Sequence, residues 1–381
     1  MKFFHLSDLH LGKRLGGYPL LEDQRYILER ILLAVEQEAP QAVVIAGDVY
    51  DRATPSAEAV ALLDDFLSRL VSLECSPQVF VIYGNHDSPE RLAFGNRLVA
   101  RSGVHLSPVF TGEITPVVLA DEFGEVAFHL LPFLKPSDAR NAYSEAAIVN
   151  YTDAVREALG HCELTASRRN VLVAHQFVTG GQRSDSEDVS VGGLDNVDAE
   201  AFAGFDYVAL GHLHRPQTVS ADGSIRYCGT PLKYSVSEKH DRKGIQVVEL
   251  GPKGSVTCRS IPLRPMHDLR EIKGSYDELT LRENYEGTAT DDYIHVVLTD
   301  ENDILDAAGR LRSIYPNILS LEYQNKRTSR ETMVEALEQV EQMGDLEILE
   351  ALYERQNNQP LAAEQRSFAE GLFQKLKEEK H

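Results

Sequence analysis

The first hundred residues alternate between short apolar runs and longer segments in which apolar side chains recur every three or four positions. The runs, rich in Val, Ile and Phe, predict buried strands, and the longer segments predict amphipathic helices. The resulting order, strand–helix repeated three times, is typical of a parallel sheet with helices packed on it. The predicted strands are 2–6, 42–46 and 79–83, and the predicted helices are 23–39, 56–73 (with Ser56 as N-cap) and 89–101.

Beyond residue 103 the apolar runs are shorter and are separated by turns that contain glycine. The runs 225–228, 245–250 and 256–261 follow one another closely, which predicts an antiparallel second sheet. Together with the parallel layer, this predicts an α/β fold of two packed sheets flanked by helices. Further strands are predicted at 117–119, 126–131, 171–174 and 206–210, with a helix at 147–159.

Two prolines, Pro262 and Pro265, predict a linker at 261–265, because each removes a backbone donor and stiffens the chain. We therefore expect a first domain over 1–262, a small α+β domain over 265–325 and a charged helical tail over 330–381. The small domain has predicted strands at 293–298 and 318–323 around a helix at 301–314. The tail has a helix-prone segment at 333–343 and a last helix with Phe368, Leu372, Phe373 and Leu376 at helical spacing.

The 381-residue chain is strongly acidic, with 59 acidic against 38 basic side chains and a formal net charge of −21. This balance argues against a protein that grips nucleic acid over its whole surface, although bound divalent cations invert the charge locally. The four cysteines form no CxxC pair and are typical of reduced thiols. The first residues are too polar for a signal peptide and no apolar run reaches membrane-spanning length, so we expect a cytoplasmic protein with no membrane partner.

Polar side chains follow five of the apolar runs, at the point where each predicted strand ends. Aspartate, asparagine and histidine recur there without a thiolate, a mixture that suits Mn, Fe or Zn better than a structural zinc site. Because open α/β sheets bind ligands at the carboxyl ends of their strands, we expect one shared metal site. The five groups are Asp8-x-His10, Gly47-Asp48, Gly84-Asn85-His86-Asp87, Ala174-His175 and Gly211-His212-x-His214.

The spacing within the first and last groups supports this prediction. Residues two apart in an extended chain point to the same side, so Asp8 and His10 can reach one cluster while Leu9 turns away. The same argument applies to His212 and His214. A single histidine of this kind is more often a hydrogen-bonded structural residue, but five such groups in this order predict a two-metal site.

The order of these groups resembles the signature of the calcineurin-like metallophosphoesterases over residues 1–262. The surrounding segments FFHLSDLHLGK, VVIAGDVYDRATPS, VIYGNHDSPERL and YCGTPLKYS are similar to one branch, the nuclease subunits of bacterial SbcCD double-strand-break repair complexes. The resemblance continues through the small domain and the tail. It implies a two-sheet metallophosphoesterase sandwich, a capping domain over 265–325 that helps to shape the DNA path, and a tail over 330–381 that docks on an ATPase.

The resemblance also implies roles for single residues. His86 would contact the scissile phosphate or leaving oxygen, as proton donor or charge stabiliser. Apart from the resemblance, the position of Asp51 three residues after Asp48 predicts that it either orients His86 or is a solvated loop carboxylate. Asp87 is predicted to be a turn residue or a supporting hydrogen-bond partner rather than a ligand. Two divalent ions are implied, with Mn²⁺ expected and Mg²⁺, Fe²⁺ or Zn²⁺ as alternatives. The implied ligands are Asp8, His10, Asp48 and His214 for one ion, and Asp48, Asn85, His175 and His212 for the other, with Asp48 bridging.

Basic side chains near these motifs are candidates for contacts to a DNA phosphate backbone. Arg52 and Arg91 lie closest to the implied ligands in sequence, followed by Lys13 and Arg14. Arg183 and Arg215 are further candidates. The alternative for each is an ordinary solvated surface group.

The resemblance implies a homodimer formed through the predicted helices 56–73 and 89–101, although packing on the sheet would use the same apolar residues. It implies that the tail docks on the coiled-coil base of an SbcC-type ATPase, with self-packing as the alternative. We therefore expect a Mn²⁺-dependent DNA nuclease, a 3′→5′ double-strand exonuclease with structure-directed endonuclease activity on single strands and hairpins. The alternatives are a general phosphodiesterase acting on small or nucleotide substrates, and a non-catalytic interaction scaffold on the same fold.

Overall fold

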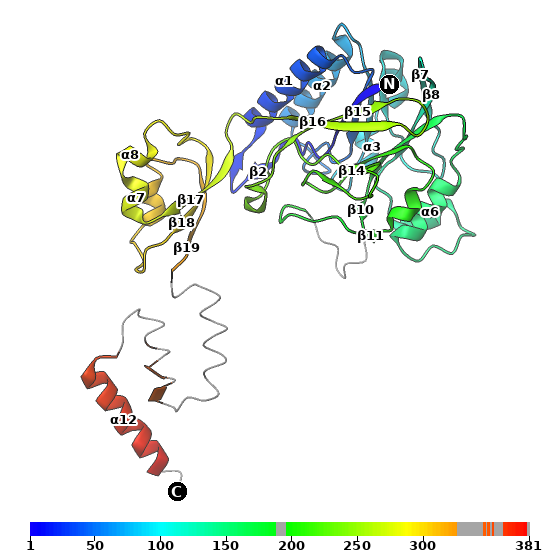
Figure 1. The fold of residues 1–381 in the computed structure, drawn as a ribbon. Helices are drawn as coiled ribbons and strands as arrows, with labels where there is room; N and C mark the ends of the chain where they lie inside the picture. Colours follow the sequence, from blue (N-terminus) through cyan, green and yellow to red (C-terminus); the bar gives the residue numbers. More distant parts are fainter. Residues whose placement is uncertain (188–195, 326–345, 348, 351–352, 354–360, 379–381) are drawn as a thin grey trace. The chain divides into compact units, whose positions relative to one another are not determined.

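The computed structural model describes residues 1–187, 196–325, 346–347, 349–350, 353 and 361–378 (Figure 1). It divides into two units, Met1–Asp268 and Leu269–His381. The division falls after the predicted linker over 261–265, and the first two residues of that linker belong to strand β16 (Val256–Pro262). The predicted helix-prone segment at 333–343 lies outside the described residues.

The first unit contains two six-stranded sheets. In the first sheet, four parallel strands are extended at one side by an antiparallel pair, β15 (Gly244–Leu250) and β16. Strand β1 lies between β15 and β4. The parallel strands are β1 (Lys2–Leu6), β4 (Ala42–Ala46), β5 (Gln78–Ile82) and β6 (Val104–Leu106).

The second sheet is mixed and has the strand order β13-β14-β12-β9-β8-β7. Its four central strands are parallel, and its two edge strands pair antiparallel with their neighbours. The strands are β7 (Val117–Asp121), β8 (Gly124–Leu131), β9 (Arg169–His175), β12 (Tyr207–Gly211), β13 (Gln217–Thr218) and β14 (Ile225–Tyr227).

The antiparallel second sheet predicted from residues 225–261 is therefore wrong. Strand β14 joins β12 in parallel, whereas β15 and β16 extend the first sheet alongside β1. Every residue of β15 except Glu249 is buried, as expected for a strand with a neighbour on each side, and no residue of the edge strand β16 is fully buried. Closely spaced runs predict that strands pair with each other, but not which sheet they extend.

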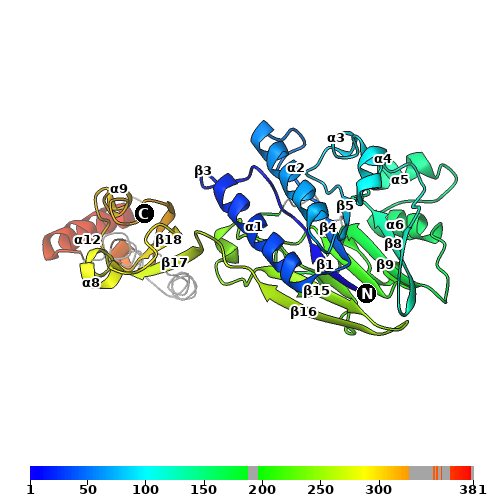
Figure 2. The same ribbon diagram turned by 90° about the horizontal axis from the view of Figure 1, so that it is seen from above.

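Apolar side chains from both sheets form a continuous core between them. The rings of Phe3 and Phe80, from the first sheet, pack on Phe128 of the second with centroids 5.6 Å and 4.5 Å away. Helices α1 (Leu21–Glu38) and α2 (Ala57–Ser72) lie side by side against the first sheet (Figures 1 and 2). Helices α5 (Pro136–Ala142) and α6 (Tyr151–Gly160) share a core with the second sheet. The predicted α/β fold of two sheets flanked by helices is confirmed.

Two helix predictions in this unit have different outcomes. Ser56 is the N-cap of α2, and its side chain accepts a hydrogen bond from Ala59 N at 3.2 Å. The helix predicted over 89–101 is broken into α3 (Pro89–Leu92), α4 (Asn96–Val99) and a 3₁₀ turn (Ala100–Ser102). The break falls at Gly95, whose φ of 74° is incompatible with a continuous right-handed helix.

The second unit has a three-stranded parallel sheet in the order β17-β18-β19. Its core includes Ile294, Val296 and Leu298, which alternate along β18 and share one face. The helix predicted over 301–314 is shorter, because Asp306, with φ of 52°, precedes it in a left-handed conformation. The elements are β17 (Leu269–Gly274), α7 (Tyr276–Thr280), α8 (Arg282–Tyr285), β18 (Tyr293–Leu298), α9 (Ala307–Leu311), β19 (Ile318–Tyr323) and α12 (Ala363–Glu378).

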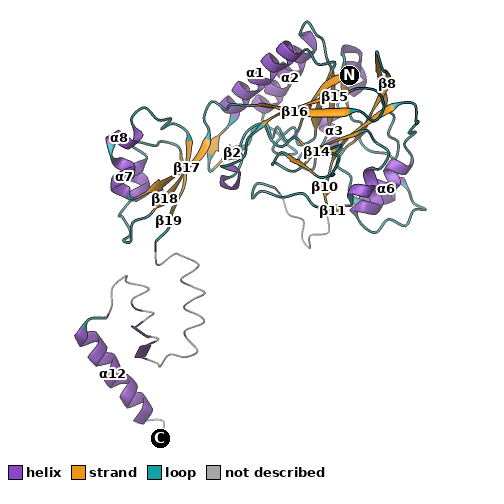
Figure 3. Ribbon diagram, in the orientation of Figure 1, coloured by secondary structure: helices purple, strands orange, loops and turns teal. Residues whose placement is uncertain are grey.

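Short elements complete the described chain, and Figure 3 separates helices from strands. Across these ranges, every helix is too short or too polar to cross a membrane. The remaining elements are β2 (Arg14–Leu15), β3 (Tyr18–Pro19), β10 (Phe177–Val178), β11 (Asn196–Val197) and the 3₁₀ turns Ala199–Phe202 and Val236–Glu238.

Candidate metal centre

The carboxyl ends of five strands, from both sheets of the first unit, meet at one place and carry all seven residues implied as ligands. The first sheet supplies the loops after β1, β4 and β5, and the second supplies the ends of β9 and β12. The two sheets approach closely here, since a Cβ added to Gly211 of β12 would lie 1.8 Å from the carbonyl oxygen of Ala46 in β4. Only glycine fits at this contact.

The loops after β1 and β4 run side by side and hold each other in place. Asp8 N donates to Gly47 O at 3.0 Å, and His10 N donates to Asp48 O at 2.9 Å. Asp8, His10 and Asp48 have φ values of 53°, 44° and 46°, so the backbone is left-handed rather than extended. The prediction that an extended chain brings Asp8 and His10 together is therefore wrong. Both side chains nevertheless reach the same cluster.

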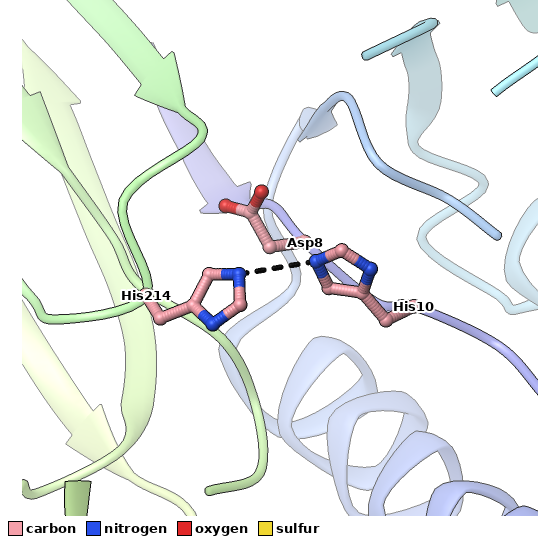
Figure 4. Close-up of side chains that lie close together, drawn as sticks. All are labelled: Asp8, His10 and His214. Atoms are coloured by element: carbon pink, nitrogen blue, oxygen red, sulfur yellow. Dashed lines mark hydrogen bonds between the residues drawn. The ribbon is translucent and has the colours of Figure 1, made fainter. Parts of the chain in front are cut away.

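The first group of donors contains Asp8, His10 and His214, whose ligand atoms lie within 4.8 Å of one another (Figure 4). The Nε2 atoms of His10 and His214 face each other at 3.1 Å. A cation about 2.1 Å from two donors at about a right angle holds those donors about 3 Å apart. The separation of the two rings therefore fits two ligands of one ion.

The second group is centred on the Oδ1 atom of Asn85. It lies 3.0 Å from His175 Nε2 and 3.0 Å from His212 Nδ1. The other ring nitrogen of His175, Nδ1, donates to Ala46 O at 2.8 Å, which leaves Nε2 as the atom available to a metal ion. His212 thus lies with the second group and His214 with the first, as the resemblance implies.

The carboxylate of Asp48 lies between the two groups. Its Oδ2 atom is 3.7 Å from His10 Nε2 and 3.4 Å from His175 Nε2. Its Oδ1 atom accepts a hydrogen bond from His86 N at 2.9 Å. Gly84 permits this approach, because a Cβ there would lie 2.1 Å from Asp48 Oδ1. The position is the one that a bridging ligand requires.

Burial sets the protonation of the histidines in this cluster. It lowers the pKa of His212 to about 3 and the pKa of His10 well below its ordinary value, so both rings are neutral at neutral pH. Buried His10 Nδ1 and His212 Nε2 have no hydrogen-bond partner. His10 Nε2 and His212 Nδ1, the nitrogens that face the donor groups, belong to neutral imidazoles. Beside two carboxylates and an amide oxygen, such rings fit a pair of divalent cations.

A buried ion pair links Asp48 and His175. Burial opposes both charges, but the imidazolium of His175 holds the pKa of Asp48 well below its usual range. In return the Asp48 carboxylate outweighs burial and raises the pKa of His175 to about 9. In the metal-free protein a proton therefore occupies a place that a cation would take.

His86 lies at the edge of the cluster, with Nε2 3.9 Å from Asp48 Oδ2. Its Nδ1 atom donates to the main-chain carbonyl of Asp51 at 3.1 Å. The Asp51 carboxylate instead accepts from Lys13 Nζ at 2.8 Å and lies 3.9 Å from His10 Nδ1. The contact from Asp51 to His86 is thus made by the backbone rather than by the side chain.

Asp87 holds two of the ligand loops together. Its buried carboxylate accepts hydrogen bonds from Gly84 N at 2.9 Å, Val49 N at 3.0 Å and Tyr50 N at 2.9 Å. These bonds join the loop that carries Asp48 to the loop that carries Asn85.

The basic residues predicted to contact DNA differ in their surroundings. The side chain of Arg52 is 78% exposed and lies 3.6 Å from Asp51. Arg91 and Arg14 are also exposed, and Arg14 donates to Gly17 O. Lys13 is half-buried, because Asp51 and the ring of Tyr234 hold its ammonium. Arg215 is half-buried and pairs with Asp241.

The side chains that contact His214 were not predicted from the sequence. Ser186, Glu187, Glu238 and Lys243 surround it. They lie in two segments without a strand-end pattern, and only the tertiary fold brings them to the end of β12.

Comparisons with known proteins find two matching family models. The family model described as calcineurin-like phosphoesterase matches residues 1–216, and the one described as type 5 capsule protein repressor C-terminal domain matches residues 265–357. A dimetal phosphatase from Danio rerio aligns with 68% of this chain and 95% of its own at 15% identity, with a TM-score of 0.40, a likeness too weak to carry an argument.

Two curated relatives are named as the SbcD component of the nuclease SbcCD. The protein from Staphylococcus epidermidis is 36% identical over 84% of this chain and 85% of its own length. The protein from Staphylococcus saprophyticus is 33% identical over 100% of this chain and 99% of its own length. The chain therefore belongs to the calcineurin-like phosphoesterases, in the group formed by the SbcD components of SbcCD nucleases.

Proposed function

We propose that the protein is a Mn²⁺-dependent DNA nuclease, a 3′→5′ double-strand exonuclease with structure-directed endonuclease activity on single strands and hairpins. Its place would be in double-strand-break repair and recombination with an SbcC-type ATPase. The observation that carries the proposal is the position of Asp48 between two donor groups, in a chain whose relatives are named as nuclease components. Two divalent ions held there would activate water and neutralise charge on a phosphodiester.

The residues of the chain supply positioning and proton transfer. Asp8, His10 and His214 would hold one ion, Asn85, His175 and His212 the other, and Asp48 both. His86 keeps a proton on Nδ1 for the Asp51 carbonyl, which leaves Nε2 facing the cluster. Nε2 can donate a hydrogen bond or a proton to a phosphate oxygen only when both ring nitrogens carry a proton, so His86 would act as the imidazolium.

DNA as the substrate is supported by the family and by cations around the cluster. Arg52, on the loop after β4, and Arg91, in helix α3 after β5, are exposed and would contact the phosphate backbone. Lys13, on the loop after β1, and Arg14, in strand β2, are weaker candidates because each already has a protein partner. Such contacts confer little sequence preference, as a repair nuclease requires.

A homodimer through the surface of α2, α3 and α4 is supported by apolar side chains left in solvent. Phe94 is 86% exposed, Leu98 is 74% exposed and Val60 is 44% exposed. If these groups form one contiguous apolar patch, that patch would be typical of an interface. The charge-introducing pair Phe94→Glu and Leu98→Glu should convert the protein to a monomer in light scattering, whereas an unchanged mass would reject this surface.

The second unit would serve as the cap and the docking region. Residues 265–325 are proposed to shape the DNA path. In the tail, Leu349, Tyr353 and Leu361 line an apolar cavity of about 580 Å³ together with Phe368, Leu372 and Phe373. Phe368 is 72% exposed, which supports docking on the coiled-coil base of the ATPase rather than complete self-packing. Phe368→Glu should abolish association with the ATPase in a pull-down, and unchanged association would reject the docking surface.

The central experiment offers purified protein and Mn²⁺ both labelled duplex DNA and a small chromogenic phosphodiester, with and without the ATPase. Cleavage of the duplex is expected, and hydrolysis of the small ester alone under both conditions would reject the nuclease proposal in favour of a general phosphodiesterase. His86→Ala should retain two bound Mn²⁺ ions and lose turnover about 10²–10⁴-fold. Loss of both ions in this variant would instead make His86 a ligand. An inactive wild-type protein that binds both ions would favour the scaffold alternative.

A further inference from the structure

Three of the four polar atoms of His214 are held by partners outside the donor cluster, and the fourth faces that cluster. Its backbone N–H donates to Glu187 Oε1 at 2.6 Å, and its carbonyl oxygen accepts from Lys243 Nζ at 2.8 Å. Its ring Nδ1 lies 2.6 Å from Ser186 Oγ. Only Nε2 is directed to the cluster, where it meets His10 Nε2 at 3.1 Å.

Ser186 is the first member of a chain of polar groups that continues away from the metal centre. Its Oγ atom also lies 2.6 Å from Glu238 Oε1. The other oxygen of Glu238, Oε2, accepts from Lys243 Nζ at 2.6 Å. Glu238 is completely buried and Lys243 nearly so. A buried carboxylate and ammonium at this distance form an ion pair, so Glu238 can only accept hydrogen bonds.

The direction of each hydrogen bond follows from the carboxylate. Because Glu238 only accepts, the single hydroxyl proton of Ser186 must point to it, and the Ser186 oxygen is then an acceptor toward His214. The proton between Ser186 and His214 therefore belongs to Nδ1. This arrangement leaves a lone pair on Nε2, the atom that faces the metal centre.

We propose that Ser186 is a positioning residue that fixes His214 in its Nδ1–H tautomer and aims the Nε2 lone pair at the first metal ion. It acts through the relay Ser186–Glu238–Lys243, in the manner of the partners that orient metal-bound histidines in other proteins. The inference rests on the proposed function only in taking His214 as a metal ligand, and it does not depend on DNA being the substrate.

The surroundings of the other ligands make this support specific to one ion. His10, which shares the first donor group, has a buried Nδ1 without a hydrogen-bond partner, and Asp51 Oδ1 lies 3.9 Å from that nitrogen. In the second group, His175 is held by the main-chain carbonyl of Ala46. Loss of the Ser186 hydroxyl should therefore weaken the first ion and spare the second.

The test measures Mn²⁺ binding to the full-length protein. Binding is monitored by calorimetry and by the decrease in the electron paramagnetic resonance signal of free Mn²⁺. Ser186→Ala should weaken one of the two binding steps about 10–100-fold and leave the other unchanged. Ser186→Thr, which keeps a hydroxyl, should restore the affinity. Ser237→Ala is the matched control, because Ser237 accepts a hydrogen bond from Asp185 N at 3.0 Å and anchors the same loop without contacting His214.

A spectroscopic measurement separates tautomer control from a general loosening of the loop. In the metal-free protein, ¹⁵N shifts of the His214 ring should report a proton on Nδ1 in the wild type and in Ser237→Ala, and a mixture of tautomers in Ser186→Ala. Two unchanged Mn²⁺ affinities in Ser186→Ala, or an equal loss in Ser237→Ala, would overturn the proposal. DNA cleavage plays no part in this readout, so a failure of the proposed function would not be mistaken for a failure of the relay.

Discussion

Both units contain parallel strands whose carboxyl ends carry polar residues, yet among the residues that the structure describes only the edge in the first unit brings possible metal ligands together. In the second unit the polar groups bond to the backbone beside them: Asp300 Oδ2 accepts from Tyr276 N at 2.8 Å, and Asn325 Nδ2 donates to Asp300 O at 3.1 Å. In the first unit, ring nitrogens and carboxylates at the corresponding edge face one another instead. A polar strand end therefore predicts where a site can be, and the partners of its side chains decide whether it is one.

The backbone shows the same difference between the units. Asp8, His10 and Asp48 all have positive φ, and so does His212 at 102°. In the described part of the second unit the non-glycine residue with positive φ is Asp306, which precedes a helix. Each such conformation costs about 1–3 kcal/mol at a functional site, so the first unit stores strain where the donors converge. The difference predicts that equivalent changes in the two units have unequal effects on hydrolysis.

The largest effect is expected for Asp48→Asn in the first unit, compared with Asp300→Asn in the second. Loss of the central charge of the donor cluster should lower hydrolysis of a small phosphodiester at least 10³-fold, equivalent to about 4 kcal/mol. Asp300→Asn keeps an acceptor for Tyr276 N and should leave this rate unchanged. Initial rates at saturating Mn²⁺, with melting curves as a folding control, check both. A rate for Asp48→Asn within tenfold of the wild type would contradict a central role for Asp48.

How far the sequence predicts these features depends on whether they are local. The strands before Asp8, Asp48 and Asn85 are short apolar runs, so both the strands and their polar ends were predictable. The place of β15 beside β1 was not, because pairing over more than two hundred residues leaves no periodic signal. The helix over 89–101 failed at Gly95, where a positive φ was needed that the apolar spacing did not indicate.

In the candidate site, the donor residues were predictable from the sequence but their hydrogen-bond partners were not. Its donors are Asp, Asn and His at strand ends, a pattern that sequence displays. The partners of these donors are not displayed, since His86 is held by a main-chain carbonyl and His214 by Ser186 of a separate loop. Backbone acceptors have no residue type, and a serine in a polar loop has many possible roles.

A cavity in the second unit should cost stability without touching the chemistry of the first. Leu311 is completely buried in the core of the second unit. Leu311→Ala should destabilise that unit by about 3 kcal/mol through lost burial and the cavity left behind. Urea unfolding should show the loss, and hydrolysis of a small phosphodiester by the folded protein should be unchanged. A parallel loss of hydrolysis would show that the activity of the first unit depends on the core of the second.

The Asp48–His175 pair gives the first unit a pH dependence that metal should remove. The pKa of His175 is raised from 6.5 to about 9 in the folded, metal-free protein, so the pair stabilises it fully below about pH 6.5, and this contribution is lost as the pH rises through 9. A bound cation displaces the same proton, so the apparent Mn²⁺ affinity should rise about tenfold between pH 6.5 and 7.5. Calorimetry in buffers of different ionisation enthalpy should detect one released proton. A Mn²⁺ affinity that does not change between pH 6.5 and 7.5 would contradict a protonated His175 in the metal-free protein.

The smallest expected effects come from two capping boxes, one in each unit. Ser275 accepts from Glu278 N and Glu278 Oε2 from Ser275 N at the start of α7, and Asn150 and Asp153 make the same reciprocal bonds at α6. Either Ser275→Ala or Asn150→Ala should cost about 1 kcal/mol, because one helix donor loses its acceptor.

The consequences of the two substitutions should nevertheless separate the units. Helix α6 shares a core with β9, the strand that ends in His175, so Asn150→Ala should lower the temperature at which metal-stabilised structure is lost. Ser275→Ala acts in a unit whose described residues hold no cluster of donors, so its melting shift should be the same with and without Mn²⁺. If the melting shifts of the two variants depend equally on Mn²⁺, the metal centre stabilises both units together. The stabilising effect of the metal would then not be confined to the first unit.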